Sequence, residues 1–347
     1  MSHSTVPRSR TEADTTGKTP VASDDTSGAT GPRRNPYQAK VSWRLRFRRD
    51  RVLLLMTLPA VLIILVFNYL PILGNIVAFE DYDPYISDNG IVSMLHSPWV
   101  GLENFQQIFA DSAFWSAVQN TLVLFFLQLI LFFPIPILLA LLINSVVRPR
   151  VRALSQAILY LPHFFSWVLV IAVFQQLLGG AGLFSQLLRQ HGFDGLDVMT
   201  DPNTFKFLIT AQSVWKDAGW GIIVFLAALS SVSPDLYEAA AMDGAGRWRR
   251  MWHVTLPALR PVIALLLVLR VGDALTVGFE QILLQRDAVG PGAAEVLDTF
   301  VWWNGVRNQD FGYAAAAGLV KGVISLGLVL AANKVAHLMG EQGVYKK

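Results

Sequence analysis

Six long apolar runs, separated by shorter polar connections, set the pattern of this 347-residue chain. Each run reaches the length of about 20 residues that a helix needs to cross the hydrocarbon core of a bilayer. Because lipid offers no partner to backbone N–H and C=O groups, each run is predicted to be helical. The predicted spans lie at about residues 52–79, 117–142, 157–178, 207–229, 262–284 and 313–338. The pattern therefore predicts an all-α polytopic membrane protein with about six transmembrane helices.

The positions of lysine and arginine orient these spans. Cytoplasmic connections carry an excess of Lys and Arg, and the connection at residues 80–115 contains neither residue. The third and fifth connections are acidic or mixed, which also favours the outer side. The basic residues that predict a cytoplasmic location for both termini and for the second and fourth connections are Arg33, Arg34, Lys40, Arg44, Arg46, Arg48, Arg49, Arg51, Arg148, Arg150, Arg152, Arg247, Arg249, Arg250, Arg260, Lys334, Lys346 and Lys347.

Composition narrows the function. Hydrophobic residues make up 53% of the chain and charged residues only 15%, a balance that indicates lipid as the main solvent. The basic residues flank the spans, so the net charge of +3 does not indicate nucleic-acid binding. The chain has no cysteine, and its six histidines show no metal-ligand spacing. No phosphate loop or nucleophile with a nearby base is recognisable, so the chain is not expected to be an enzyme or to hold a metal or cofactor.

The chain divides into a tail and one membrane domain. Residues 1–45 are rich in Ser, Thr, Gly and Pro and bury too little apolar surface to fold, so a disordered, basic cytoplasmic tail is predicted there. Residues 46–347 form the predicted transmembrane domain. A long cytoplasmic connection at residues 231–261 lies within it.

That long connection is predicted to be structured. Pro234 begins a helix-forming stretch that reaches Met242, and Gly244 separates it from a second stretch ended by Pro257. Two short helices meeting near Gly244 follow from this pattern. In the second helix, Trp248, Met251 and Trp252 fall on one face beside three arginines. Such a face suits either the groove of a partner protein or the membrane surface.

The spacing of individual residues in this connection favours the partner protein. The connection resembles the EAA loop of permeases from binding-protein-dependent ABC importers, with Val254 in place of the usual Ile. The surrounding residues are similar to the carbohydrate, maltose-type branch, and so are YLPHFFSW at residues 160–167 and GFEQILLQ at residues 278–285. The resemblance covers the chain from about residue 53 onward. The matching positions are Glu238, Ala239, Ala240, Asp243, Gly244, Leu256 and Pro257.

The resemblance implies a type I ABC importer permease fold and a set of partners. A second permease subunit, expected to be a different chain, would complete the pore in the membrane lipid. Two cytoplasmic ATPase subunits would bind ATP and Mg²⁺, and an extracytoplasmic solute-binding protein would deliver a sugar or oligosaccharide. The short coupling helix would sit in a cleft of an ATPase subunit, with Glu238 as its polar contact, and drive alternating access.

Charged residues inside spans are costly in lipid and indicate a functional path. Lys216 and Asp217 stand beside two tryptophans, a combination that suits sugars. Arg270, Asp273 and Glu280 are expected on roughly one face of the fifth span. The candidate substrate-pathway residues are Trp215, Lys216, Asp217, Trp220, Arg270, Asp273, Glu280 and Lys321.

Structural roles remain open for several of these residues. Arg270 with Asp273, or Lys321 with Glu280, could form internal ion pairs that touch no substrate. Gly318 and Gly322 in the sixth span are predicted to be a helix-packing pair.

Two other functional classes fit part of the pattern. An ion-coupled secondary transporter would also use intramembrane charges, but it would normally show repeated spans. A membrane scaffold protein would explain the structured cytoplasmic connection but would give no role to the charged residues inside the spans.

Overall fold

The structure is a computed structural model that describes residues 50–195 and 197–338. The chain divides into two compact units, Met1–Ile64 and Leu65–Lys347. Within the described ranges every regular element is a helix, and the β-structure is limited to one isolated bridge between Glu80 and Trp99. The all-α fold class is therefore confirmed. The predicted tail at residues 1–45 lies outside the described residues.

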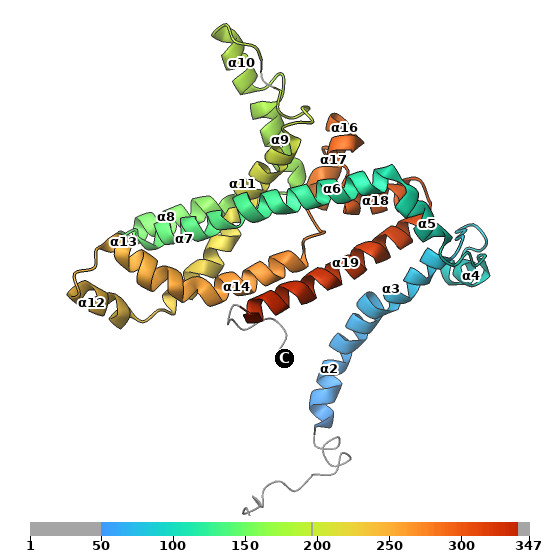
Figure 1. The fold of residues 1–347 in the computed structure, drawn as a ribbon, viewed down its shortest axis with the longest axis horizontal. Coiled ribbons are helices and arrows are strands. Elements are labelled where there is room, and N and C mark those ends of the chain that lie inside the picture. Colours follow the sequence, from blue (N-terminus) through green and yellow to red (C-terminus); the bar gives the residue numbers. More distant parts are fainter. Residues whose placement is uncertain (1–49, 196, 339–347) are drawn as a thin grey trace, which may run out of the picture. The chain divides into compact units, whose positions relative to one another are not determined.

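The helices are shown in Figure 1. Their bounds are α2 (Arg51–Ile64), η1 (Leu65–Tyr69), α3 (Leu70–Leu73), η2 (Gly74–Phe79), α4 (Gly90–His96), α5 (Glu103–Ala110), α6 (Ser112–Leu127), η3 (Gln128–Phe132), α7 (Pro134–Asn144), α8 (Pro149–Tyr160), η4 (Leu161–Phe164), α9 (Trp167–Leu178) and α10 (Leu183–Gln190). They continue with α11 (Phe205–Ser230), α12 (Pro234–Met242), α13 (Arg247–Arg250), η5 (Met251–Thr255), α14 (Leu256–Gly272), α15 (Phe279–Leu283), α16 (Arg286–Val289), α17 (Pro291–Ala294), α18 (Leu297–Trp302), η6 (Trp303–Arg307) and α19 (Phe311–Leu338).

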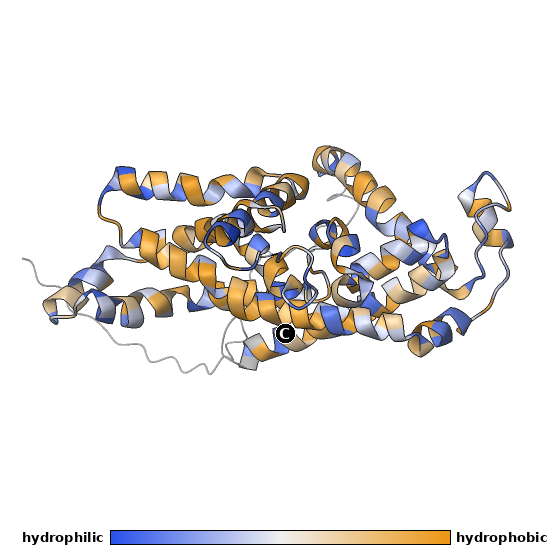
Figure 2. Cartoon of the chain, turned by 90° about the horizontal axis from the view of Figure 1, so that it is seen from above, coloured by the Kyte–Doolittle hydropathy of each residue, from blue (hydrophilic) through white to orange (hydrophobic). Residues whose placement is uncertain are grey.

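Six helical segments in the described ranges are long and apolar enough to cross a membrane, as predicted. Figure 2 shows hydrophobic residues along much of their length. Their bounds are Arg51–Phe79, Ser112–Asn144, Trp167–Gln190, Phe205–Ser230, Arg247–Gly272 and Phe311–Val335. The third and fifth differ most from the predicted ranges.

The first span is the least buried of the six. Helix α2, the described part of the first unit, contains no buried residue. In the second unit, η2 packs against α19 at its outer end, where Gly312 allows the close approach. A Cβ atom on Gly312 would lie 2.7 Å from the carbonyl oxygen of Glu80. The Asn104 side-chain amide fixes this corner by donating to the carbonyl oxygens of Ala78 (3.1 Å) and Glu80 (3.0 Å).

Three clusters of buried apolar side chains hold the second unit together. The first, around Phe114 and Phe300, joins η2, α5, α6, α18 and α19. The second, around Phe205 and Ile282, joins α6, α11, α15 and α17. The third, around Phe225, joins α7, α11 and α14. Within a membrane such packing is stabilised by van der Waals contact rather than by removal of apolar surface from water. Helix α11 takes part in two of the clusters and is central to this unit.

The third span is interrupted, so the prediction of one continuous helix at 157–178 is wrong. Helix α8 ends at Tyr160, η4 follows, and α9 starts at Trp167. Pro162 lacks the N–H that a continuing helix would use, which favours the break. Ser166 caps the new helix, because its hydroxyl accepts a hydrogen bond from the Leu169 backbone N–H at 3.3 Å.

The fifth span is also shorter at its outer end than the predicted 262–284. Helix α14 stops at Gly272, and the chain turns through residues 273–278 before α15 begins. Gly278 adopts φ +64°, a left-handed conformation that glycine reaches without steric cost. Arg270 and Glu280 consequently do not share a helical face, and that expectation is corrected.

The fifth connection folds back onto the second span as the short helices α16 to α18. The Asn120 side-chain amide donates to the carbonyl oxygens of Gly292 (3.1 Å) and Glu295 (2.9 Å). The Leu297 backbone N–H donates to the Thr121 hydroxyl at 2.9 Å. These bonds hold the connection as a structured segment against the middle of α6.

Candidate functional site

The cytoplasmic connection forms the helical hairpin that its sequence predicts. Ser233 caps α12 by accepting a hydrogen bond from the Asp235 backbone N–H at 3.2 Å. Gly244 has φ +72° and lies in the turn between α12 and α13. The Ala245 backbone N–H donates to the Ala240 carbonyl at 2.9 Å and closes the end of α12. The hairpin is thus defined by its local sequence.

The hairpin is strongly exposed, and neither α12 nor α13 contains a buried residue. The exposed fractions of Met242, Trp248 and Trp252 are 89%, 71% and 57%. A hydrogen bond of 3.2 Å between the hydroxyls of Tyr237 and Thr255 ties α12 to η5. Large apolar side chains so exposed on a polar hairpin mark an interaction surface.

The residues of the predicted coupling loop are distributed over both helices. Glu238 and Ala239 are exposed on α12, whereas Ala240 is half-buried. Asp243 is exposed and directly precedes the turn at Gly244. Leu256 and Pro257 are half-buried and form the first turn of α14. This segment therefore connects the exposed hairpin to the fifth span without interruption.

A second candidate site lies in the membrane domain, where α11 meets η4. The Lys216 ammonium donates to the carbonyl oxygen of His163 at 2.8 Å and lies 3.8 Å from the Asp217 carboxylate. Asp217 Oδ1 is 2.9 Å from His163 Nδ1. Lys216 is 8% exposed and also lies over the Trp167 ring, 5.4 Å from its centroid. Three titratable side chains thus meet at the break in the third span.

Aromatic rings flank this charged cluster. The rings of Tyr160, His163 and Trp220 stack on one another, with centroids 5.1 to 6.1 Å apart and interplanar angles of 18° to 21°. Trp215 lies nearby, tilted against Phe165 at 6.4 Å. Trp215 and Trp220 are 40% and 53% exposed, so part of each ring remains accessible outside these contacts. The sequence indicated the tryptophans but missed His163, although it lies inside the quoted YLPHFFSW stretch.

Gly219 makes the close approach of α8 to α11 possible. A Cβ atom there would lie 2.1 Å from the Leu159 carbonyl oxygen and 2.7 Å from the Tyr160 Cα atom. Real Cβ atoms essentially never come within 3.0 Å of another heavy atom. Glycine is therefore required for the stack of Tyr160, His163 and Trp220 to form.

Arg270 approaches this region from the fifth span. Its guanidinium donates to the Gln128 side-chain oxygen and lies over the Phe132 ring, 5.7 Å from the centroid. Asp273 and Asp217 both interact electrostatically with the guanidinium. Asp273 is exposed just beyond the end of α14. Arg270 thus contacts Gln128 and Phe132 directly, in addition to the electrostatic interaction with Asp273 that the sequence left open as an internal ion pair.

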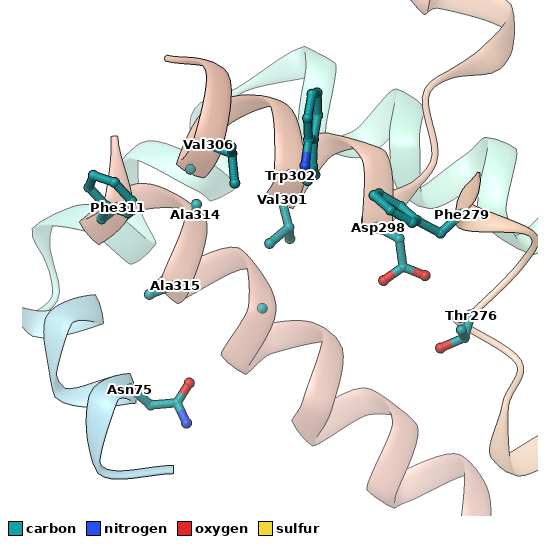
Figure 3. A pocket seen from close by; sticks show the side chains of 12 residues that line it. Asn75, Thr276, Phe279, Asp298, Val301, Trp302, Val306, Phe311, Ala314 and Ala315 are labelled. Atoms are coloured by element: carbon teal, nitrogen blue, oxygen red, sulfur yellow. The ribbon is translucent and has the colours of Figure 1, made fainter. Parts of the chain in front are cut away.

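Lys321 pairs with Asp298 of α18, not with Glu280. The alternative of a Lys321–Glu280 pair, which the sequence left open, is not borne out, because Asp298 comes from the fifth connection, which folds back onto α19. Glu280 is exposed on α15. Asp298 lines a pocket of about 590 Å³. Figure 3 shows its carboxylate pointing into this pocket, with Thr276 on another wall. Lys321 thus pairs with a carboxylate that lines this pocket and is separate from the cluster on α11.

The predicted packing role of the sixth-span glycines finds no partner among the described residues. A Cβ atom on Gly318 or Gly322 would meet no described atom within 4 Å. Gly318 instead lines the pocket beside Asp298.

A buried amide network that the sequence did not reveal joins α11 to α15. The Gln281 side-chain amide donates to Gln212 Oε1 at 2.7 Å, and the Gln285 amide donates to the same oxygen at 3.0 Å. The Ser213 hydroxyl donates to Gln281 Oε1 at 3.1 Å. These three glutamines are 0% to 3% exposed. The i, i+4 spacing of Gln281 and Gln285 was the available signal, and the network fixes the register of α15 on α11.

Comparison with known proteins identifies the family. Residues 132–338 match the family described as "Binding-protein-dependent transport system inner membrane component". The chain is 41% identical to the polygalacturonan/rhamnogalacturonan transport system permease protein YteP of Bacillus subtilis over 302 residues, covering 87% of this chain and 92% of YteP. Protein LplB of Bacillus subtilis is 39% identical and covers 88% of this chain, with 94% of LplB matched.

Solved structures agree. A chain of a bacterial alginate ABC transporter, solved in complex with an alginate pentasaccharide-bound periplasmic protein, superposes with a TM-score of 0.79 at 36% identity. The match covers 87% of this chain and 99% of the alginate transporter chain. These comparisons give no support to an ion-coupled secondary transporter. The chain therefore belongs to the family of binding-protein-dependent transport system inner membrane components, and it is a multi-pass permease subunit of the cell membrane.

Proposed function

We propose that this chain forms part of the translocation path of an ATP-driven importer whose substrate is an oligosaccharide that carries carboxylates. The cluster on α11 is the observation that carries the proposal. There, Lys216 and Asp217 lie beside the stacked rings that include Trp220. Flat aromatic faces pack against the apolar faces of pyranose rings, while charged groups bind hydroxyls and carboxylates.

Two cations in this region suit an acidic substrate. Lys216 and Arg270 belong to different spans, and Asp217 interacts with both of them. A uronate carboxylate could take the place of Asp217 as the partner of Lys216, while Asp217 accepts hydroxyl hydrogen bonds. Relatives support this choice, because YteP is named for polygalacturonan and rhamnogalacturonan and the solved importer is described as an alginate transporter. A solved relative is described as importing the acidic polysaccharide alginate.

The interrupted helices support a path at the same place. Non-helical backbone within a membrane is tolerated where it is buried in protein or lines a water-filled cavity. The third span breaks at residues 165–166 beside Lys216 and Asp217, and α14 ends beside Arg270 and Asp273. Exposed Asp273 would be costly in lipid and is accommodated if this side faces the path.

The partners follow from the hairpin and the family. The exposed surface of Met242, Trp248 and Trp252 would enter a cleft of a cytoplasmic ATPase subunit, with Glu238 as a polar contact. A second permease, expected to be a different chain, would complete the pore, and two ATPase subunits would bind ATP and Mg²⁺. This chain would perform no chemistry itself. ATP-driven closure of the ATPases would move the hairpin and, through α14, reorient the path.

The test is ATP hydrolysis by the complex in lipid nanodiscs, with its ATPases, second permease and binding protein. Trigalacturonate is expected to stimulate hydrolysis, and maltotriose, a neutral trisaccharide, is expected to do so much less. Lys216→Met should raise the half-saturating concentration of trigalacturonate by about tenfold, as expected for loss of a charged contact.

Glu238→Arg tests the coupling role in the same complex. It should abolish stimulation without changing thermal stability, because Glu238 is exposed. Asp235→Asn, at an exposed position of the same helix, is the matched control. Equal stimulation by the two trisaccharides would exclude the acidic substrate, and normal coupling in Glu238→Arg would exclude the polar contact.

A further inference from the structure

A surface pocket of about 340 Å³ lies beside the start of α6, separate from the cluster on α11. Its lining residues come from the start of the second span and from the fifth connection. The rim residues Ser112, Ser116 and Pro291 are exposed, whereas Arg286 and Glu295 at its base are buried. By the distribution of Lys and Arg, this end of α6 faces the outside of the cell.

Glu295, at the buried base of this pocket, has an unused hydrogen-bonding position. Its side chain is only 9% exposed. Oε2 accepts from the Arg286 guanidinium, at 2.7 Å from Nε and 2.5 Å from the second terminal nitrogen. Oε1 is buried and has no hydrogen-bond partner among the described residues. A buried carboxylate oxygen without a hydrogen-bond donor is unfavourable, so a donor supplied by another molecule would make the free energy of binding more favourable.

The other charged groups of the pocket are already engaged. The Arg286 guanidinium lies over the Trp303 ring at 3.8 Å and also contacts Asp287 at 3.3 Å. Asp111 accepts from the Ala113 backbone N–H at 2.7 Å and from the Tyr313 hydroxyl at 2.6 Å. The lining therefore contains two carboxylates and one guanidinium, an excess of negative charge. A cationic donor fits this balance best.

A metal ion is not the cation that the pocket suits. The described residues contain no group of three or more His, Cys, Asp or Glu side chains that could hold one. An ammonium or guanidinium group needs fewer ligands, and the side-chain oxygens of Glu295, Ser116 and Asn304, which all line the pocket, are acceptors for it.

The family indicates which partner binds the outer face of this chain, because a binding-protein-dependent importer receives its solute from a separate protein. We propose that the Glu295 pocket receives a lysine or arginine side chain of the extracytoplasmic solute-binding protein when that protein docks. Buried polar anchors surrounded by an exposed rim are typical of the residues that dominate interface affinity. The Arg286 contact holds Glu295 in place before docking.

The experiment measures the dissociation constant of the solute-binding protein from the complete transporter in nanodiscs. Glu295→Gln should weaken docking by about tenfold or more, since one partner of a buried charge pair is lost. Wild-type docking should also weaken with added salt more steeply than docking of the variant. Asp287→Asn is the control, because Asp287 contacts the same guanidinium but lies outside the pocket and is 82% exposed.

A second pair of variants avoids the buried base of the pocket. Ser116→Arg would supply Glu295 with a cation from this chain and so block the partner's cation, whereas Ser116→Gln adds bulk without charge. Ser116→Arg should weaken docking much more than Ser116→Gln, and both should fold because the site is exposed.

Several results would overturn the proposal. Unchanged docking of Glu295→Gln would mean that water alone satisfies the oxygen. Equal effects of the two Ser116 variants would mean that bulk alone acts. Unchanged docking with a raised half-saturating substrate concentration would make the pocket a substrate site.

Discussion

Replacing Gly219 by alanine would place a methyl group where the backbone of α8 already lies. The Cβ atom would lie 2.1 Å from the Leu159 carbonyl oxygen, and ordinary van der Waals contact begins at 3.4 Å. The helices would therefore have to part by about 1.3 Å, the difference between these two distances. The opposing atoms are backbone and cannot rotate away. Overpacking of this kind typically costs about 1–3 kcal/mol.

The displacement would also reach the charged cluster. The Lys216 ammonium bonds the His163 carbonyl at 2.8 Å, and a shift of this size would break that hydrogen bond. We expect Gly219→Ala to lower the thermal unfolding midpoint of the transporter in nanodiscs. We also expect it to raise the half-saturating substrate concentration in stimulated ATP hydrolysis.

Gly327→Ala is the matched control for this prediction. Gly327 is an exposed glycine in the interior of α19, and a Cβ atom there would meet nothing within 4 Å. Alanine should be neutral there or stabilise the helix by up to about 1 kcal/mol, the usual difference in helix propensity. The reasoning would be refuted if Gly219→Ala matched Gly327→Ala in both stability and substrate response.

Three further changes test other parts of the structure. Lys321→Leu leaves the Asp298 carboxylate without its counter-ion and should lower the free energy of unfolding by about 3–5 kcal/mol. The double variant Lys321→Leu with Asp298→Leu should recover most of this loss. Thermal melts of the wild type, the two single variants and the double variant test this, and a double variant whose loss is the sum of the two single losses would contradict it. Gly244→Val forces a β-branched residue to φ +72°, which should destabilise the hairpin by about 1–2 kcal/mol and reduce coupled ATP hydrolysis. Gly246→Ala, at φ −65°, should leave both the hairpin and coupled hydrolysis unchanged. Burial raises the pKa of Glu80 above its usual 4.5. The contribution of Glu80 to stability is therefore fully present below pH 4.5 and is lost as the pH rises through the raised pKa. Glu80→Gln should flatten this decline in melting temperature with pH, and an unchanged pH profile of the melting temperature in the variant would contradict a role for Glu80.

The apolar runs alone were sufficient to predict the number and type of the spans. A backbone in lipid must satisfy its own hydrogen bonds, so about 20 apolar residues leave little choice but a helix. The cytoplasmic hairpin was equally local, because Pro234 and Gly244 act on the backbone of their own segment. The family resemblance rested on the same local spacing, and the family match over residues 132–338 agrees with it.

The places where helices break were less visible in the sequence. Residues 273–278 are apolar enough to read as a continuation of the fifth span, yet the chain turns there. The turn is stabilised from outside the segment by the Gln212, Gln281 and Gln285 network, which fixes α15 against α11. An apolar pattern reports the solvent around a segment and does not report a buried polar contact from another helix.

The partner of each charged side chain was decided by the tertiary structure. Lys321 pairs with Asp298, and Arg270 bonds Gln128, which lies 142 positions away in the sequence. Such pairs form only after the fifth connection folds onto α19 and the second span packs beside the fifth. The sequence determined which residues are too polar for lipid, since that cost belongs to each side chain. Which group pairs with each polar side chain depends on how closely the helices approach at positions such as Gly219. The pattern of apolar and polar residues does not contain these distances between helices.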